Sequence, residues 1–471
     1  MDISQLKKLR AAGKQEEMAA LAHALDLYTT PGLSVHYKTT QALSIPSLET
    51  LIYQACAQVL RGLPTLFVVP VVVEGAQTYF ARLPTIDLRK VTTFLQRQNS
   101  IPDDGSGRDS ELDALLQEQV NTNYKSDQGI LPVWRLVVLY DFTDRQQFTA
   151  TFMVHHGIAD GASMQMVQRE FHKALHNLSS SQPAPESQVE YIIPSSDDDG
   201  IGPPLESLHS LPILEEVPPT DAPKYKDWIG KLPEVPSKTG WATLTLSPPM
   251  VQAFVQQCRK NKVGTPSGLN ALIAKVVYSN LPSTTESLNI NIPVDLRSDL
   301  PPKAVDGVMG NFWDTFQTRI LRSDISKQDS SELGDIWAAA RKVQSDTRKY
   351  MSRTAPSGEL YLNVAGLKNI PDLQAFLKGM IGGPRVESLE LTYIGPYAPY
   401  SDPKKGNELV WQAGRASICR CVFALGACLQ MTGVMHPEGM TIGFAWPRGA
   451  IEEDLVDKTI EGIRNYFVSI S

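Results

Sequence analysis

The sequence FMVHHGIADGASM, residues 152–164, places two adjacent histidines at the end of an apolar run, with an aspartate four residues beyond the second. The overlapping stretch QFTATFMVHH, residues 147–156, is rich in β-branched and aromatic side chains and predicts a strand. The stretch ASMQMVQREFHKALHNL, residues 162–178, carries apolar side chains at helical spacing. The sequence therefore predicts a strand, a short turn and a helix, with His155 and His156 at the end of the strand.

His156 has the chemistry of a general base. An imidazole titrates near neutral pH, so it can take a proton from an attacking alcohol or amine and return it to a leaving group. The end of a strand would hold the ring rigidly at the edge of a cleft. Asp160 has two possible roles in the turn: its side chain can cap the helix, or it can pair with an arginine and so fix the loop that carries His156.

The histidine pair has two other interpretations, a metal site and a purely structural pair bound in the core. Neighbouring side chains on a strand point to opposite faces, so His155 and His156 do not easily share an ion. The sequence contains no HExxH motif, and we expect no metal. The structural interpretation stays open from these residues alone.

The sequence gives little support to a protein nucleophile. It has no G-x-S-x-G motif, and none of its five cysteines lies in a recognisable nucleophile context. Neither a P-loop nor a G-x-G-x-x-G follows a strand, so we expect no permanently bound cofactor. A base without a protein nucleophile suits direct transfer between two bound substrates.

Length and composition narrow the class of protein. The chain has 471 residues, too many for one ordinary core, and its length predicts two or three domains. Hydrophobic residues make up 42% and charged residues 20%, as in folded globular proteins. The net charge is −7 and no basic stripe occurs, so nucleic acid is not expected as a partner.

The sequence also predicts where the protein works. The cysteines have no metal-ligand spacing, which indicates a reduced, intracellular protein with structural thiols. The N-terminus has no apolar signal segment, and the longest apolar run, at 63–73, contains two prolines and is too short to cross a membrane. We expect a cytoplasmic protein without a transmembrane segment, with a monomer as the default state.

Residues 179–240 differ in composition from the rest of the chain. They hold 11 of its 33 prolines, which predicts an extended crossover or linker. Mixed strand and helix patterns lie on both sides of this segment. We therefore expect an α/β fold of mixed sheets, with an N-terminal domain at 1–178, a linker at 179–240 and a C-terminal domain at 241–471.

Hydrophobic patterns predict further elements in both halves. WRLVVLYDF at 134–142 predicts a strand that pairs with 147–156 as a hairpin. SLETLIYQACAQVL at 47–60 predicts an amphipathic helix with Ser47 as its N-cap. Beyond the linker, the patterns predict helices at 248–262, 267–281 and 452–467 and strands at 241–247, 287–296, 387–397 and 440–447.

The motif HHGIADG, residues 155–161, resembles the HHxxxDG signature of the CoA-dependent acyltransferase superfamily. This superfamily contains chloramphenicol acetyltransferase, peptide-synthetase condensation domains and the plant HxxxD acyltransferases. The order and spacing of LPVWRLVVLYD at 131–141, VQQCRKNKVGTPSGLNALIAKVV at 255–277 and NIPVDLRSDLPPKAVDGVMGNF at 291–312 are most similar to those of the fungal alcohol O-acetyltransferases. The plant Asp-Phe-Gly-Trp-Gly block is absent, which argues against the plant branch.

The resemblance implies two chloramphenicol-acetyltransferase-like domains with a tunnel at their interface. CoA would enter from one side and the acceptor from the other, and they would meet at the second histidine of the motif, His156. Asp160 would be structural, and Arg297 in the VDLR segment is its candidate partner. His155 and Gly161 would support the motif, and Thr392 in LTYIGPY could donate to an oxyanion or line the tunnel.

The activity implied by the resemblance is acyl transfer, with acetyl-CoA or another acyl-CoA as co-substrate and a small-molecule, secondary-metabolite alcohol as acceptor. Three alternatives stay open from the sequence. A condensation-type enzyme would join an amine or alcohol to a carrier-bound acyl group. A pericyclase or isomerase, or a binding protein without catalysis, would keep the fold and lose the transfer, and fold analogy does not separate these.

Overall fold

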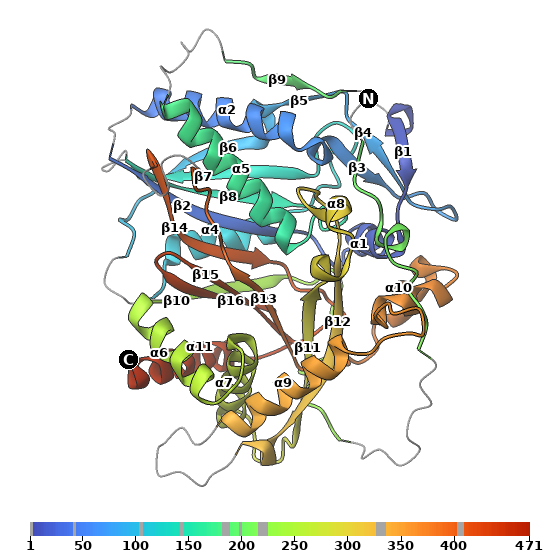
Figure 1. Ribbon diagram of the computed structural model, residues 1–471, viewed down its shortest axis with the longest axis vertical. Coiled ribbons are helices and arrows are strands. Elements are labelled where there is room, and N and C mark those ends of the chain that lie inside the picture. Colours follow the sequence, from blue (N-terminus) through green and yellow to red (C-terminus); the bar gives the residue numbers. More distant parts are fainter. Residues whose placement is uncertain are drawn as a thin grey trace.

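The computed structural model describes nine segments of the chain, namely residues 3–40, 44–102, 107–141, 146–180, 189–196, 200–214, 225–325, 336–402 and 409–471. They form two large sheets, one of five strands and one of six. Figure 1 shows the sheets in the middle of the molecule, with one group of helices above them and another below. The α/β class with mixed sheets, predicted from the sequence, is confirmed.

The five-stranded sheet carries the histidine motif. Its strands, in order across the sheet, are β14 (Trp411–Arg420), β2 (Pro31–Thr39), β8 (Gln147–Val154), β7 (Trp134–Tyr140) and β6 (Thr92–Gln96). β7 and β8 are antiparallel neighbours, which confirms the predicted hairpin, although residues 142–145 of its turn lie outside the described residues. β8 is buried over nearly its whole length between β2 and β7. Apolar side chains on one face pack in the core, and Thr149 and Thr151 on the other face bond to His36 and Ser34 of β2.

Two long helices cover the outer face of this sheet. They are α2 (Ile45–Gly62) and α5 (Gly161–Ser180), and their apolar faces pack with the strands in one hydrophobic core. The N-cap of α2 is Ser44, whose Oγ accepts from the main-chain nitrogen of Ser47 at 3.3 Å. The prediction of Ser47 as N-cap was wrong because a proline is tolerated in the first turn of a helix, where no N–H is needed, so α2 begins earlier.

The six-stranded sheet belongs to the second half of the chain. Its order is β10 (Thr239–Leu246), β16 (Gly439–Pro447), β15 (Leu429–His436), β13 (Leu389–Pro396), β11 (Ser287–Asp295) and β12 (Trp313–Leu321). Four helices pack with it in a second core: α6 (Pro248–Lys260), α7 (Thr265–Asn280), α9 (Trp337–Met351) and α11 (Glu453–Ile470). The helices predicted at 248–262, 267–281 and 452–467 correspond to α6, α7 and α11.

One strand of the first sheet comes from the far end of the sequence. β14 follows β13 of the six-stranded sheet along the chain, yet it pairs with β2 over the register Trp411↔Thr39 to Arg420↔Pro31. The domain boundaries at 178 and 240 stay a prediction. β14 belongs to the predicted C-terminal domain by sequence, but it pairs with a strand of the predicted N-terminal domain. Within the predicted linker, β9 (Ile192–Pro194) pairs with β5 (Thr85–Asp87).

The remaining elements surround these sheets. α1 (Lys14–Ala24) and α4 (Ser110–Val120) share a third hydrophobic cluster with residues of both large sheets, including Met153, Trp241 and Cys419. The other short elements are β1 (Lys7–Ala11), β3 (Val68–Val71), β4 (Tyr79–Arg82), α3 (Leu88–Val91), α8 (Pro302–Val305) and α10 (Leu373–Met380).

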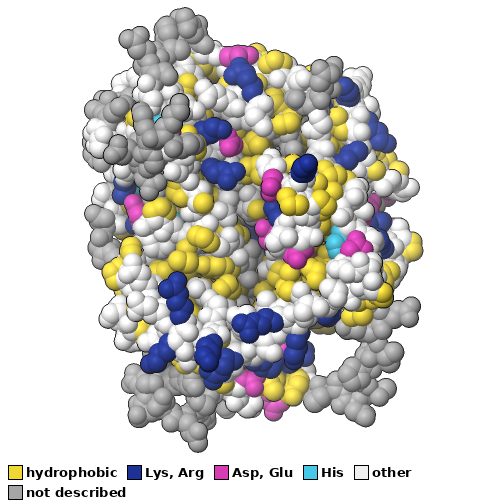
Figure 2. All heavy atoms as spheres, in the orientation of Figure 1, with side chains coloured by type: hydrophobic (Ala, Val, Ile, Leu, Met, Phe, Trp, Pro, Cys, Tyr) yellow, Lys and Arg dark blue, Asp and Glu magenta, His cyan; other side chains and the backbone are white. Residues whose placement is uncertain are grey.

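The two halves meet along a band across the middle of the molecule. Figure 2 shows hydrophobic side chains gathered in this band and Lys and Arg side chains gathered below it, towards the helices of the second half. None of the helices in the described segments is both long and apolar enough to cross a membrane.

Candidate active site

A cavity of about 590 Å³ lies between the two sheets, and His156 forms part of its wall. β8 ends at Val154, so His156 stands just beyond a strand that is held by neighbours on both sides. The cavity is lined by residues of α1, β11, β12 and β13, the start of α5 and the end of β14. α1 is tied to β12, since Gln15 Nε2 donates to the carbonyl oxygen of Trp313 at 2.7 Å.

The side chain of Asn311 holds the His156 ring. His156 Nδ1 lies 3.1 Å from Asn311 Oδ1. Asn311 Nδ2 donates to the main-chain carbonyl oxygens of His156 at 2.8 Å and Gly157 at 3.1 Å. Asn311 stands in the GNF block that supported the resemblance, but the sequence assigned it no role, because nothing in a linear pattern showed that residue 311 returns to the histidine motif.

Aromatic rings flank His156. Its ring centroid lies 5.5 Å from that of Trp313 and 5.7 Å from that of Tyr28. Burial lowers the pKa of His156 below its usual range, and the nearby Arg420 charge acts in the same direction. The imidazole is therefore neutral at pH 7 and able to accept a proton.

His155 has a different environment. It is buried, and its Nδ1 accepts a hydrogen bond from the main-chain nitrogen of Gly157 at 2.8 Å. Its ring packs against that of His23, with 4.6 Å between centroids, and burial lowers its pKa well below the usual value. His155 thus has the core hydrogen bond and burial that the structural interpretation requires, whereas His156 also forms part of the cavity wall.

Asp160 makes the contacts that both of the roles considered for it would require. Its carboxylate accepts from Arg297 through two hydrogen bonds, of 2.8 and 2.9 Å. It also accepts from the main-chain nitrogen of Ser163 at 2.9 Å, as a cap of α5, and from that of Phe312 at 3.0 Å. Burial alone would raise the pKa of Asp160, but the Arg297 charge and these hydrogen bonds lower it below its usual value. The carboxylate fixes the loop and is not free to act on a substrate.

Gly161 and Thr392 lie in the cavity wall as well. A Cβ atom on Gly161 would be 2.7 Å from Cγ2 of Ile394, so glycine lets α5 begin close to β13. Thr392 Oγ1 donates to Glu390 Oε1 at 3.2 Å, and this bond uses its only hydroxyl hydrogen. A role for Thr392 as an oxyanion donor, which stays a prediction, would require that bond to break.

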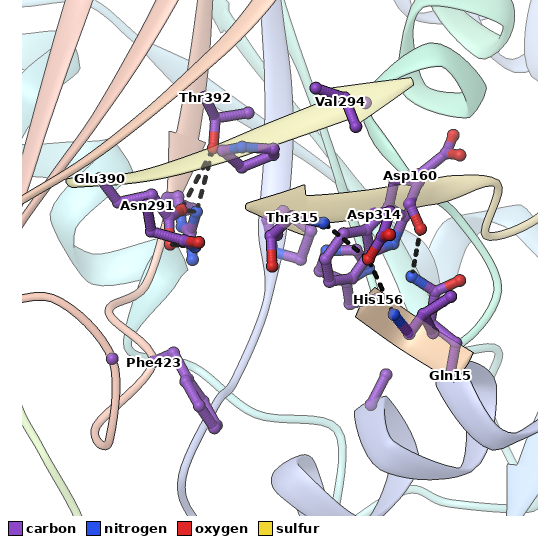
Figure 3. A pocket seen from close by; sticks show the side chains of 18 of the residues that line it. Gln15, His156, Asp160, Asn291, Val294, Asp314, Thr315, Glu390, Thr392 and Phe423 are labelled. Atoms are coloured by element: carbon purple, nitrogen blue, oxygen red, sulfur yellow. Dashed lines mark hydrogen bonds and ion pairs between the residues drawn. The ribbon is translucent and has the colours of Figure 1, made fainter. Parts of the chain in front are cut away.

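Thr392 belongs to a polar cluster that the sequence did not reveal. Arg420 forms an ion pair with Glu390, and Asn291 Nδ2 donates to Glu390 Oε2 at 3.1 Å. Figure 3 shows Thr392, Glu390 and Asn291 on one side of the pocket and His156 and Asp160 on the other. The cluster joins β11, β13 and β14, and no motif in the separate segments could have shown this meeting.

Glu387 is another titratable group in the cavity wall. Burial, together with the charge of Glu390, raises its pKa to about 7. Gln317 Nε2 donates to Glu387 Oε1 at 3.1 Å. Glu387 therefore changes charge near neutral pH. A pH profile of activity must distinguish the titration of Glu387 from that of His156.

The described segments support neither a metal site nor a cysteine that acts as a nucleophile. They contain no group of three or more His, Cys, Asp or Glu side chains arranged to hold a metal ion. All five cysteines are buried and free of disulfides, and burial raises the pKa of each thiol; for Cys56, Cys258, Cys419 and Cys428 it rises to about 12. A thiol that stays protonated is a poor nucleophile.

Comparison with known proteins gives matches along nearly the whole chain. No family model matches the sequence. Over 460 residues the chain is 36% identical to the probable alcohol acetyltransferase crmB of Aspergillus fumigatus, and the alignment covers 97% of this chain and 98% of that protein.

Solved structures share the fold at lower identity. The trichothecene 15-O-acetyltransferase TRI3 from Fusarium sporotrichioides superposes with a TM-score of 0.71 at 12% identity, covering 98% of this chain and 95% of that one. The starter condensation domain of rhizomide synthetase, solved with C8-CoA, superposes with a TM-score of 0.58 at 13% identity, covering 98% and 95%.

Proposed function

This chain belongs to the alcohol acetyltransferase family, within the CoA-dependent acyltransferases, and from that membership we propose that it transfers an acetyl group from acetyl-CoA to a hydroxyl of a small-molecule acceptor, with His156 as general base. The observation that carries the proposal is the position of His156. It is a neutral imidazole at the end of a buried strand, and it forms part of the wall of the cavity between the two sheets.

In the proposed reaction, both substrates lie in the cavity. His156 takes the proton of the acceptor hydroxyl on Nε2, and the oxygen attacks the carbonyl carbon of the thioester. The tetrahedral oxyanion that forms collapses, the carbon–sulfur bond breaks and the ester is released. The leaving thiolate takes the proton back from His156, so the imidazole is neutral again and CoA leaves as the thiol.

The cavity supports this reaction through its size and composition. Its volume of about 590 Å³ is typical of sites for drug-sized molecules, and most of its lining is apolar. Holding the hydroxyl and the thioester together removes the entropic cost of a bimolecular encounter, and excluding water limits hydrolysis of the thioester. An apolar secondary-metabolite alcohol fits such a site, and the trichothecene named for TRI3 is a molecule of this kind.

The proposed activity is tested by release of thiol from acetyl-CoA with a panel of alcohols and amines, with the ester or amide product identified by mass spectrometry. We expect release that depends on an alcohol and yields its acetate ester. Reactions without acceptor measure background hydrolysis. Transfer only from an acyl group on a carrier protein, with acetyl-CoA neither bound nor used, would contradict the proposal and favour a condensation-type enzyme.

The pH dependence of kcat/KM is expected to report His156 on its acid side. The base must be unprotonated, and its pKa lies below the usual 6.5, so activity should fall only as the pH drops below about 6.5 and be full above it. Glu387→Gln removes the other cavity group that titrates near neutral pH, and the acid limb should remain in this variant. If kcat/KM instead falls near pH 7, and this fall disappears in Glu387→Gln, the titrating group is Glu387 and not His156.

A further inference from the structure

The amide of Asn311 lies behind the His156 ring, on the Nδ1 side. We propose that Asn311 is a positioning residue that holds neutral His156 in the tautomer with the proton on Nδ1, and so leaves Nε2 as the free base. The proposal rests on His156 being the base of the proposed function. Its evidence is the hydrogen-bond pattern around Asn311, which does not depend on the identity of the acceptor.

The first step is the orientation of the Asn311 amide, which its neighbours determine. Two main-chain carbonyl oxygens, of His156 and Gly157, face the nitrogen end and can only accept. The indole Nε1 of Trp313, which can only donate, lies 3.2 Å from the oxygen end. Rotating the amide by half a turn would set donor against donor and acceptor against acceptor at all three contacts.

The orientation of the amide determines which nitrogen of the His156 imidazole carries the proton. The atom that faces His156 Nδ1 is Asn311 Oδ1, an acceptor, so Nδ1 must carry the hydrogen of this 3.1 Å bond. A neutral imidazole has one N–H and one bare nitrogen, and burial keeps His156 neutral at pH 7. Nε2 is therefore the bare nitrogen, which is the form that can accept a proton from a hydroxyl.

The neighbouring histidine has the opposite arrangement. His155 Nδ1 accepts the main-chain N–H of Gly157, so its proton is on Nε2. The two adjacent rings thus differ in tautomer as well as in location, and Gly157 contributes to both: its N–H binds His155 and its carbonyl oxygen binds Asn311. His155 is not an equivalent second base.

Without Asn311, the main-chain carbonyl oxygen of His156 itself is the acceptor that remains for the ring, so the proton on Nδ1 would be held less firmly. An unconstrained imidazole favours the tautomer with the proton on Nε2, which would present an N–H to the substrate hydroxyl in place of a lone pair. A base held in the wrong tautomer costs up to about 10⁴-fold in rate. Because the ring of Asn311→Ala can still exchange between tautomers, we expect kcat to fall by much less than this bound of about 10⁴-fold, in proportion to the population with the proton on Nε2.

The experiment reads the tautomer directly. Protein labelled with ¹⁵N-histidine is examined by long-range ¹H–¹⁵N NMR, and the His156 signals are assigned by their loss in His156→Ala. In the wild type we expect a protonated Nδ1 and an unprotonated Nε2, and in Asn311→Ala a population with the proton on Nε2. Asn270→Ala is the matched control: Asn270 is as buried as Asn311 at 3% exposure, but it lies in α7, outside the cavity wall, where its Nδ2 donates to the carbonyl oxygen of Pro266.

A wild-type His156 protonated on Nε2, or an unchanged tautomer in Asn311→Ala, would overturn the proposal. So would an equal loss of kcat in Asn270→Ala. Asn311→Asp gives a second reading, once thermal unfolding shows that it folds despite one carboxylate oxygen facing the carbonyl oxygens of His156 and Gly157. Its other oxygen still accepts from Nδ1 and stabilises the imidazolium, so the acid limb of kcat should move to higher pH. An unmoved limb in that variant would also overturn the proposal.

The failure of this inference and that of the proposed function are distinguishable. The NMR measurement needs no substrate. An Nδ1–H tautomer in a protein that transfers no acetyl group would contradict the proposed function alone, whereas transfer by a protein with the Nε2–H tautomer would contradict only the role of Asn311.

Discussion

His156→Ala is expected to lower kcat by about 10²- to 10⁴-fold, the usual contribution of a general base. The substrates can still bind together in the cavity, so the residual rate should exceed that of the uncatalysed reaction. The measurement is acetyl-CoA-dependent ester formation with an accepted alcohol, and the thermal unfolding midpoint of the variant should stay close to that of the wild type, because His156 lies at the cavity wall and not within a core cluster.

His36→Ala is the control for this result. His36 is also a buried histidine, on β2, where it contacts Thr149 and Gln147, and it is not part of the cavity wall. It should keep its kcat even if its stability falls. Full activity in His156→Ala would remove His156 from the reaction, and an equal loss in His36→Ala would show that activity follows general damage to the sheet.

Asp160→Ala is expected to lower the free energy of unfolding by about 3–5 kcal/mol, the range for breaking a buried ion pair from one side. The side chains of Asp160 and Arg297 are 6% and 16% exposed, so the variant leaves a largely buried charge whose remaining ion-pair partner, Asp295, is mostly exposed. It also removes the acceptor of the Ser163 and Phe312 main-chain nitrogens, a loss that no apolar replacement of Asp160 restores. Urea unfolding measures the change in the free energy of unfolding. The dependence of this free energy on urea concentration should have the same slope in the variant and the wild type, which shows that both expose the same surface on unfolding.

The double variant Asp160→Leu with Arg297→Met removes both charges of the ion pair, and so distinguishes the cost of an unpaired charge from the other effects of losing Asp160. Replacing both partners of an ion pair with apolar side chains is often close to neutral, so the double variant should recover the part of the loss due to the unpaired charge, but not the part due to the Ser163 and Phe312 main-chain nitrogens. Asp160→Ala with wild-type stability and normal activity would contradict the structural role. The folded pKa of Asp160 is lowered, so its contribution to stability is present above the unfolded value of about 3.9 and is lost as the pH falls through the folded pKa.

Local patterns in the sequence predicted the elements around the motif well. β7, β8 and α5 follow from runs of apolar residues at strand and helix spacing, and the resemblance correctly indicated an alcohol acetyltransferase. The pairing of Arg297 with Asp160 was expected from the resemblance and is present in the structure, although no spacing rule derives it. The catalytic role of His156 stays a prediction until activity is measured.

The features that escaped prediction depend on contacts between distant segments. Asn311 reaches His156 from the segment just before β12, and Glu390 on β13 meets Arg420 at the end of β14. The alternation of apolar and polar residues along a strand predicts which side chains share a face of the sheet, but it does not predict which strands become neighbours. The N-cap of α2 was missed for a local reason, since both Ser44 and Ser47 have suitable side chains and the structure uses the earlier one.

The pairing of β14 with β2 has a consequence for biosynthesis. While the ribosome is still making the segments before 411–420, β2 can pair with β8 but its other edge has no partner. An unpaired strand edge is a site for aggregation, and non-local pairings of this kind form slowly. Since Arg420 at the end of β14 also lines the cavity, a nascent chain cannot complete the pocket before that strand has emerged and docked. Chaperone protection of the β2 edge during translation would then matter more for yield than the final stability of the protein.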